Sequence, residues 1–152
     1  MFLNTLKCVS LSLLFLSSNL SFGTTNLIVY KDPNCGCCGK WVSYLNQQGL
    51  QATAENTNKI AQIKALYGIP GSSRSCHTAV TSNNKYVFEG HVPVTSIQKM
   101  LQAPPKGAIG LAVAGMPIGS PGMEIGDQIE TYDVLLIMSD GSTQVFETIN
   151  RL

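Results

Sequence analysis

Three of the five cysteines in the sequence fall within four residues, inside the segment YKDPNCGCCGKWVSYLNQQG at positions 30 to 49. Cys35 and Cys38 have the C-x-x-C spacing of a dithiol switch, in which one thiol attacks a disulfide and the other resolves it. A plain switch needs only two thiols, so Cys37 indicates a further use. Three neighbouring thiolates make a soft ligand set, which selects Cu(I) and, less exclusively, zinc.

A fourth thiol, Cys76, opens the later segment CHTAVTS. A structural zinc site usually combines two short cysteine or histidine pairs, and here the second pair is only Cys76 and His77. Their side chains should point to opposite faces if both lie in a strand. A zinc site built from Cys35, Cys38, Cys76 and one more ligand stays open as an alternative. So does a small exported domain stapled by two structural disulfides.

Further candidate ligands lie outside the cysteines. Met116 and Met123 stand in the glycine-rich segment GMPIGSPGME, and their thioethers suit Cu(I) as well as they suit adaptable apolar packing. His77 and His91 are isolated histidines. Each is a candidate metal ligand, a base that assists thiol exchange, or a hydrogen-bonded structural residue.

The first 23 residues predict a secretory signal peptide. Lys7 is the only charge before Lys31, the run CVSLSLLFLSSNLSF is too short to span a membrane, and Ser21 and Gly23 suit a cleavage site. An uncleaved anchor is the alternative. Cleavage after Gly23 removes Cys8 and leaves one domain, residues 24–152, with no membrane span. Export favours the bacterial periplasm, where thiols can be oxidised.

The balanced charge of the chain argues against nucleic acid and membrane surfaces as partners. Without Lys7 the chain has nine Lys and Arg residues against nine Asp and Glu residues, out of the ten and nine in the full sequence. A neutral domain without a basic stripe is unlike a protein that binds nucleic acid or an anionic membrane surface.

The hydrophobic pattern predicts the elements that must position these thiols. Apolar runs, turn residues and helix stops indicate the order β-α-β-α-β-β-α, with Asn58 and Thr95 or Ser96 as helix N-caps; the segments are 26–30, 38–49, 50–57, 58–68, 76–82, 86–90 and 93–105. This α/β order is the thioredoxin-like plan, with a parallel first strand pair. The first and third strands should lie side by side. Cys76 should then reach the cluster and, in the oxidised protein, pair with Cys35 or Cys37.

The C-terminal part is predicted to be an extension of that fold. Residues 109–126 contain five glycines and two prolines and should not form one regular element. Residues 131–149 read as a β-hairpin, with apolar runs on either side of Asp140-Gly141.

The segments YKDPNCGCCGKWVSYL, SCHTAV, EGHVP and GLAVAGMPIGSPGME, followed by YDVLLI, resemble the CopG-type family of small exported bacterial proteins. The resemblance covers residues 27 to 138. It implies a thioredoxin-like fold, a part in copper resistance, and copper binding through the C-x-C-C cysteines and the later cysteine. A copper-linked oxidoreductase role is also implied. Carried over by motif, the ligands are Cys35, Cys37, Cys38 and Cys76, whereas the motif does not decide on Met116, Met123, His77 and His91.

Together these patterns predict a periplasmic copper-binding protein that holds one or more Cu(I) ions on four thiolates, with copper ions and other periplasmic copper-handling proteins as partners. Oxidation of the same thiols would couple to copper release. The rival hypothesis is an enzyme, a thiol–disulfide oxidoreductase in which Cys35 attacks and Cys38 resolves. Against general protein-disulfide exchange, SRSCHT lacks the proline that precedes the third strand in thioredoxins.

Overall fold

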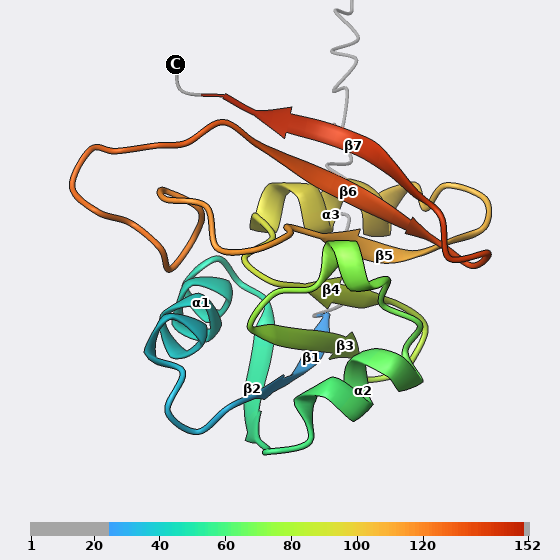
Figure 1. Ribbon diagram of the computed structural model, residues 1–152, viewed down its shortest axis with the longest axis horizontal. Helices are drawn as coiled ribbons and strands as arrows, with labels where there is room; N and C mark the ends of the chain where they lie inside the picture. The colour runs from blue at the N-terminus through green and yellow to red at the C-terminus, as the bar shows by residue number, and fades with distance from the viewer. Residues whose placement is uncertain (1–24, 151–152) are drawn as a thin grey trace, which may run out of the picture.

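A computed structural model of the protein describes residues 25–150, so the predicted signal peptide lies outside the described residues. This part of the chain is a mixed α/β fold, in which three α-helices pack around one seven-stranded sheet (Figure 1). Across the sheet, the strands lie in the order β2-β1-β3-β4-β5-β6-β7. None of the helices within residues 25–150 is both long and apolar enough to cross a membrane.

The first part of the fold has the predicted order of elements. The elements are β1 (Asn26–Lys31), α1 (Gly36–Gln47), β2 (Gln51–Asn56), α2 (Ile60–Leu66), β3 (His77–Thr81), β4 (Val87–Glu89) and α3 (Val94–Gln102), with one 3-10 turn at Gly71–Ser73. The pairing of β1 with β2 is parallel, and β3 runs antiparallel to both β1 and β4. The predicted adjacency of the first and third strands is therefore confirmed, and it places the start of β3 beside the end of β1.

The C-terminal extension adds three strands to the edge formed by β4. These are β5 (Ala108–Ala112), parallel to β4, and the hairpin β6 (Tyr132–Met138) and β7 (Thr143–Ile149). The hairpin was predicted, but β5 was not. Gly110 lies so close to β4 that a Cβ there would meet the carbonyl oxygen of Val87 at 1.9 Å. The glycine that argued against a strand thus permits the close approach of the two backbones.

Two hydrophobic layers cover the faces of the sheet. Alternate strand residues pack against apolar side chains of α1 and α3 on one face; this layer includes Leu27, Val29, Phe88, Leu111, Trp41, Leu45, Ile97 and Met100. The residues between them form the second layer with Ile69, which follows α2; this layer includes Val80, Val87, Ala112 and Ile137. The two-residue period of a strand explains this division.

The helix starts differ from those predicted. The first helix begins at Gly36 rather than Cys38, with Cys35 as its N-cap residue. The N-cap of α2 is Lys59 rather than Asn58, because the Thr57 hydroxyl accepts the Lys59 N–H at 3.0 Å and the preceding turn extends by one residue. The N-cap of α3 is Pro93 rather than Thr95 or Ser96, since the extended backbone of this proline leads directly into the first helical turn.

Candidate metal site

The turn between β1 and α1 sets the positions of the three clustered cysteines. The Asp32 carboxylate accepts the Asn34 N–H at 2.8 Å, and the Asp32 carbonyl oxygen accepts the Cys35 N–H at 3.0 Å. The helix then starts at once, so Cys37 and Cys38 both fall within its first turn. Free N–H groups and the positive end of the helix dipole favour thiolates at this place.

Two of these cysteines form a disulfide, Cys35–Cys38. This is the bond that the C-x-x-C spacing predicts for a dithiol switch, because the second cysteine lies one helical turn beyond the first. Cys37 is free, and its Sγ lies 3.6 Å from that of Cys35. Cys76 is also free, so the predicted disulfide between Cys76 and Cys35 or Cys37 is not the pairing found in the structure.

Cys76 nevertheless joins the cluster. Its Sγ and those of Cys35, Cys37 and Cys38 all lie within 4.8 Å of one another. Because Cys76 stands just before β3 rather than inside it, the strict alternation of a strand does not apply to it. The expectation that Cys76 and His77 face apart is therefore wrong: the Sγ of Cys76 lies 3.2 Å from Nδ1 of His77.

His91, which follows β4, approaches the same sulfur. Its Nε2 lies 3.2 Å from Sγ of Cys76, and its Nδ1 lies 2.8 Å from the carbonyl oxygen of Pro121. Since a carbonyl oxygen only accepts hydrogen bonds, Nδ1 carries the proton and the lone pair of a neutral ring is on Nε2, toward Cys76. Cys76, His77 and His91 thus form a second group whose ligand atoms lie within 4.8 Å of one another.

Burial controls the protonation of this second group. It raises the pKa of the Cys76 thiol to about 11, and the nearby Cys37 adds to the effect. It lowers the pKa of His91, although the hydrogen bond to Pro121 and the charge of Glu124 oppose this. The pKa of His77 lies well below its ordinary value because the ring is buried and near His91 and Lys64. A metal that binds here meets neutral imidazoles and displaces a thiol proton.

The His77 ring is completely buried. Its centroid lies 4.4 Å from that of Trp41, whose indole N–H donates to the carbonyl oxygen of Val92 at 3.0 Å. Nε2 of His77 has no hydrogen-bond partner among the described residues. A buried polar atom without a partner is uncommon in a folded protein and points to a role beyond packing.

The long loop between β5 and β6 passes beside α1 (Figure 1). A Cβ at Gly122 would lie 2.9 Å from the Trp41 backbone nitrogen and 3.0 Å from the Cys37 carbonyl oxygen. Only a glycine at this position therefore lets the loop backbone approach the first turn of α1 so closely. Met123, the next residue, is therefore attached to a segment that touches the cysteine-bearing turn. Met116 lies on the same loop with 52% of its surface exposed.

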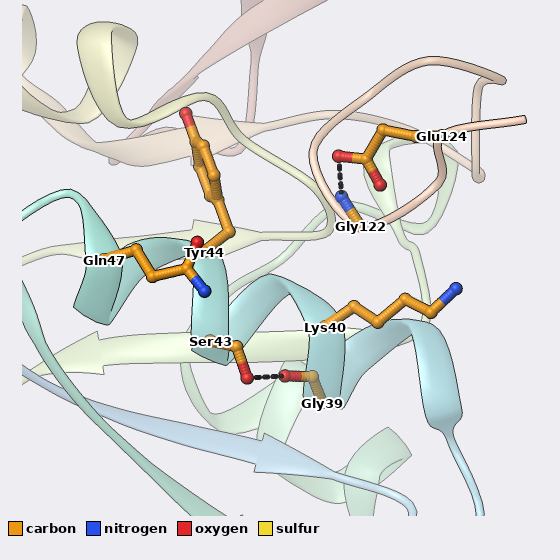
Figure 2. Close-up of a pocket in the computed structure, with 7 residues that line it drawn as sticks. All are labelled: Gly39, Lys40, Ser43, Tyr44, Gln47, Gly122 and Glu124. Atoms are coloured by element: carbon orange, nitrogen blue, oxygen red, sulfur yellow. Dashed lines mark hydrogen bonds between the residues drawn. The ribbon is translucent and has the colours of Figure 1, made fainter. Parts of the chain in front are cut away.

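A separate hollow of about 540 Å³ lies between the outer side of α1 and this loop (Figure 2). Its lining is mostly polar: Gly39, Lys40, Ser43, Tyr44, Gln47, Gly122 and Glu124. One Glu124 carboxylate oxygen accepts the Gly122 N–H at 2.8 Å, a hydrogen bond within the loop itself. None of the predicted ligands lines this hollow, so the candidate site is the sulfur cluster and its histidines, and not this depression.

Three residues that shape the site are not among those predicted from the sequence. These are Pro121, which orients His91; Gly122, which allows the loop to touch α1; and Glu89, a carboxylate with no exposed surface. Glu89 was visible as the one charge in the apolar run YVFEG. The roles of Pro121 and Gly122 depend on a contact between distant segments, and no local pattern distinguishes them from their neighbours.

Comparison with known proteins adds a family. A family model described as "Protein of unknown function, DUF411" matches residues 73–123. A solved structure described as copper resistance protein copG, form 2, is 35% identical, with a TM-score of 0.78 over 84% of this chain and 100% of that chain. Form 1 is also 35% identical, with a TM-score of 0.77 over 84% of this chain and 98% of that one. No curated protein matches the sequence.

Proposed function

The chain belongs to the family of copper resistance protein CopG, and from this premise we propose that it binds Cu(I) in the periplasm through Cys35, Cys37, Cys38 and Cys76. The observation that carries the proposal is the convergence of the four sulfur atoms within 4.8 Å of one another. Four thiolates in so small a volume can bridge metal ions, so the proposed copper site holds more than one ion when all four are reduced.

The donor set fits copper. Thiolate and imidazole are ligands that Cu(I) prefers, and the site offers no cluster of carboxylates that would suit a hard cation. His91 is held by Pro121 with Nε2 directed at Cys76, and the buried Nε2 of His77 has no hydrogen-bond partner within residues 25–150. We include both histidines in the proposed site, and Met116 and Met123, on the loop between β5 and β6, as thioether ligands.

The proposed copper chemistry is coupled to the Cys35–Cys38 pair. Formation of this disulfide removes two thiolates from the ligand set and leaves Cys37 and Cys76. Two thiolates that join in a disulfide release two electrons, which would reduce two Cu(II) ions to Cu(I). The protein would thus bind copper tightly when reduced and weakly when oxidised, and could convert Cu(II) to Cu(I) in the same site.

The second candidate is a thiol–disulfide oxidoreductase without a metal, with Cys35 as the attacking thiol and Cys38 as the resolving one. The disulfide at the N-terminus of α1 favours it. It gives no role to Cys37, Cys76 or the two histidines, which is why copper binding is the preferred proposal. A structural zinc site remains the weaker alternative because it would need only four of these ligands.

Anaerobic titration of the reduced protein with Cu(I), against a chromophoric chelator, tests the main proposal. The reduced chain, without residues 1–23, should take up copper with loss of all four titratable thiols. The protein with Cys35–Cys38 oxidised should bind fewer ions and more weakly. Equal binding in both states, or a preference for zinc under the same competition, would refute it.

The redox part is tested by adding Cu(II) to the reduced, metal-free protein in the presence of a Cu(I) chelator. Two Cu(I) ions should form for each Cys35–Cys38 disulfide that peptide mapping recovers. An active oxidoreductase would instead reduce a protein disulfide such as that of insulin, with a dithiol as electron source and no need for copper.

The proposed location follows from the predicted signal peptide. Expression of the full chain in a Gram-negative bacterium should release a periplasmic protein that begins at Thr24. Copper ions and other periplasmic copper-handling proteins are the partners that this location offers. A product found in the cytoplasm with residues 1–23 attached would contradict it.

A further inference from the structure

A buried ion pair lies behind the candidate site. Lys64 in α2 and Glu89 at the end of β4 are 4% and 0% exposed, and the Lys64 ammonium group donates to Oε1 of Glu89. Lys64 also donates to the Thr78 hydroxyl at 3.1 Å, and that hydroxyl donates to Oε2 of Glu89 at 2.6 Å. The three side chains therefore connect α2, β3 and β4 inside the fold.

The same carboxylate holds the residue that precedes the distant cysteine. Oε1 of Glu89 accepts the backbone N–H of Ser75 at 2.6 Å, one residue before Cys76. The Ser75 hydroxyl donates to the carbonyl oxygen of Gly115, on the loop between β5 and β6. A Cβ at Gly90 would meet that of Ser75 at 2.6 Å, so the segment has almost no freedom on this side.

Stability alone is a weak reason to keep such a pair. Removing two charges from water is costly, and well-packed neutral side chains often stabilise a core as well as a buried ion pair does. A buried carboxylate does, however, give a strong and directional acceptor to a backbone N–H. Here that acceptor points at the backbone of a loop, and the loop carries the one thiol of the cluster that is not on α1.

We infer that Glu89, held by Lys64, is a positioning residue for Cys76: by fixing the Ser75 N–H it keeps the Cys76 sulfur within reach of the three cysteines of α1. The inference rests on the proposed four-thiolate copper site and names how the fold completes it. Glu89 itself does not reach the metal ligands; it acts through the backbone of Ser75.

Two double variants separate this role from packing. Lys64→Met/Glu89→Gln removes both charges and keeps an amide oxygen that can accept the Ser75 N–H, whereas Lys64→Met/Glu89→Leu removes the acceptor as well. The Leu variant should bind Cu(I) about 10–100-fold more weakly, the usual range when the support of a ligand is lost. The Gln variant should stay within about twofold of the wild type. Thr78→Val, which removes the hydrogen bond to Oε2 of Glu89 but keeps the Ser75 contact, should also leave the Cu(I) affinity unchanged.

A double-mutant cycle with Cys76→Ser tests whether the effect passes through Cys76. In the Cys76→Ser background the Gln and Leu variants should bind Cu(I) equally well. If the Leu effect persists there, or if both variants lose the same affinity, Glu89 acts on the fold as a whole and the inference is wrong. If Cys76→Ser by itself leaves Cu(I) binding unchanged, the four-thiolate proposal fails instead.

A milder change covers the case in which the Leu variant does not fold. Glu89→Asp keeps the charge beside Lys64 but withdraws the carboxylate by one methylene from the Ser75 N–H. Cu(I) affinity should fall about tenfold, the lower end of the range for a supporting group, and this loss should vanish in the Cys76→Ser background. An unchanged affinity in Glu89→Asp, with circular dichroism showing a folded protein, would overturn the inference.

Discussion

The two sides of the candidate site differ in how they are built. On the α1 side, Cys35, Cys37 and Cys38 are close because they are neighbours in the sequence, and two of them are already joined. On the opposite side, Cys76 directly precedes β3 and His91 follows β4. These two residues come into contact only when the sheet has formed. That side is held by two hydrogen bonds, one from the Ser75 N–H to the Glu89 carboxylate and one from Nδ1 of His91 to the Pro121 carbonyl oxygen.

The chemistry of the two sides differs in the same way. The α1 side is at a helix N-terminus, and the positive end of a helix dipole favours thiolates. The opposite side is buried, and burial raises the pKa of Cys76 to about 11 and keeps both histidines neutral. A local dithiol pair suited to electron transfer therefore faces a buried set, one protonated thiol and two neutral imidazoles, and in the proposed function copper would connect the two.

The largest effect should follow from Cys37→Ser, which removes a ligand that the dithiol switch does not use. Cu(I) affinity should fall by more than about 100-fold, beyond the loss typical of a supporting residue. The fold and the Cys35–Cys38 disulfide should remain, as circular dichroism and peptide mapping would show. An unchanged Cu(I) affinity would show that Cys37 is not a ligand and that the α1 side is only a dithiol switch.

A smaller loss is expected from His91→Gln on the opposite side. Gln can still donate to the Pro121 carbonyl oxygen, but it cannot present an imidazole lone pair to the metal. Cu(I) affinity should fall about tenfold, while the disulfide still forms at the wild-type rate. If copper binding were unaffected and disulfide formation were slowed, His91 would be a base for thiol exchange rather than a ligand.

Trp41 should report on both sides at once, since it lies on α1 and its ring centroid is 4.4 Å from that of His77. Copper loading should change its fluorescence, because the metal would bind beside His77, whose ring packs against that of Trp41. Oxidation of the metal-free protein should have a smaller effect, confined to the α1 side. The Cys37→Ser variant serves as the control that should lose most of the copper-dependent change. A spectrum indifferent to copper and oxidation would contradict the geometry.

The smallest effect is expected far from the site, at the exposed pair of Lys99 in α3 and Glu147 in β7. Burial raises the pKa of Glu147, but hydrogen bonds from Lys99 and Ser96 outweigh it, and the pKa lies below its ordinary value of 4.5. The pair therefore stabilises the fold above about pH 4.5 and loses this contribution as the pH falls through the lowered pKa.

Because Lys99 is 58% exposed, Glu147→Gln should cost only about 0.5 kcal/mol of unfolding free energy at pH 7. Chemical denaturation at pH 7 and at a series of lower pH values would measure this, and the difference from the wild type should shrink as the pH falls through the lowered pKa of Glu147. Cu(I) affinity should not change. A change in copper binding would show that the hairpin is coupled to the site.

Much of this protein can be predicted from sequence because the signals are local. The C-x-C-C cluster after an apolar strand, the strand and helix periods, and the Asp140-Gly141 turn indicated the element order and the hairpin that the structure has. The disulfide of Cys35 with Cys38 also follows from local spacing, since a helix brings residues three apart onto one side. The expected disulfide of Cys76 with Cys35 or Cys37 is wrong. It was inferred from the strand order, whereas Cys38, three residues from Cys35, is the nearer partner in the sequence.

Only the tertiary structure decided what surrounds Cys76. Strand β5 depends on a glycine that lets two backbones touch, and a glycine-rich sequence by itself argues for a loop. The orientation of His91 depends on the carbonyl oxygen of Pro121, 30 residues away in sequence, and that of the Ser75 segment on a carboxylate from another strand. Such contacts have no local pattern because their energy comes from burial and from satisfying hydrogen bonds that form only once the sheet has brought the segments together.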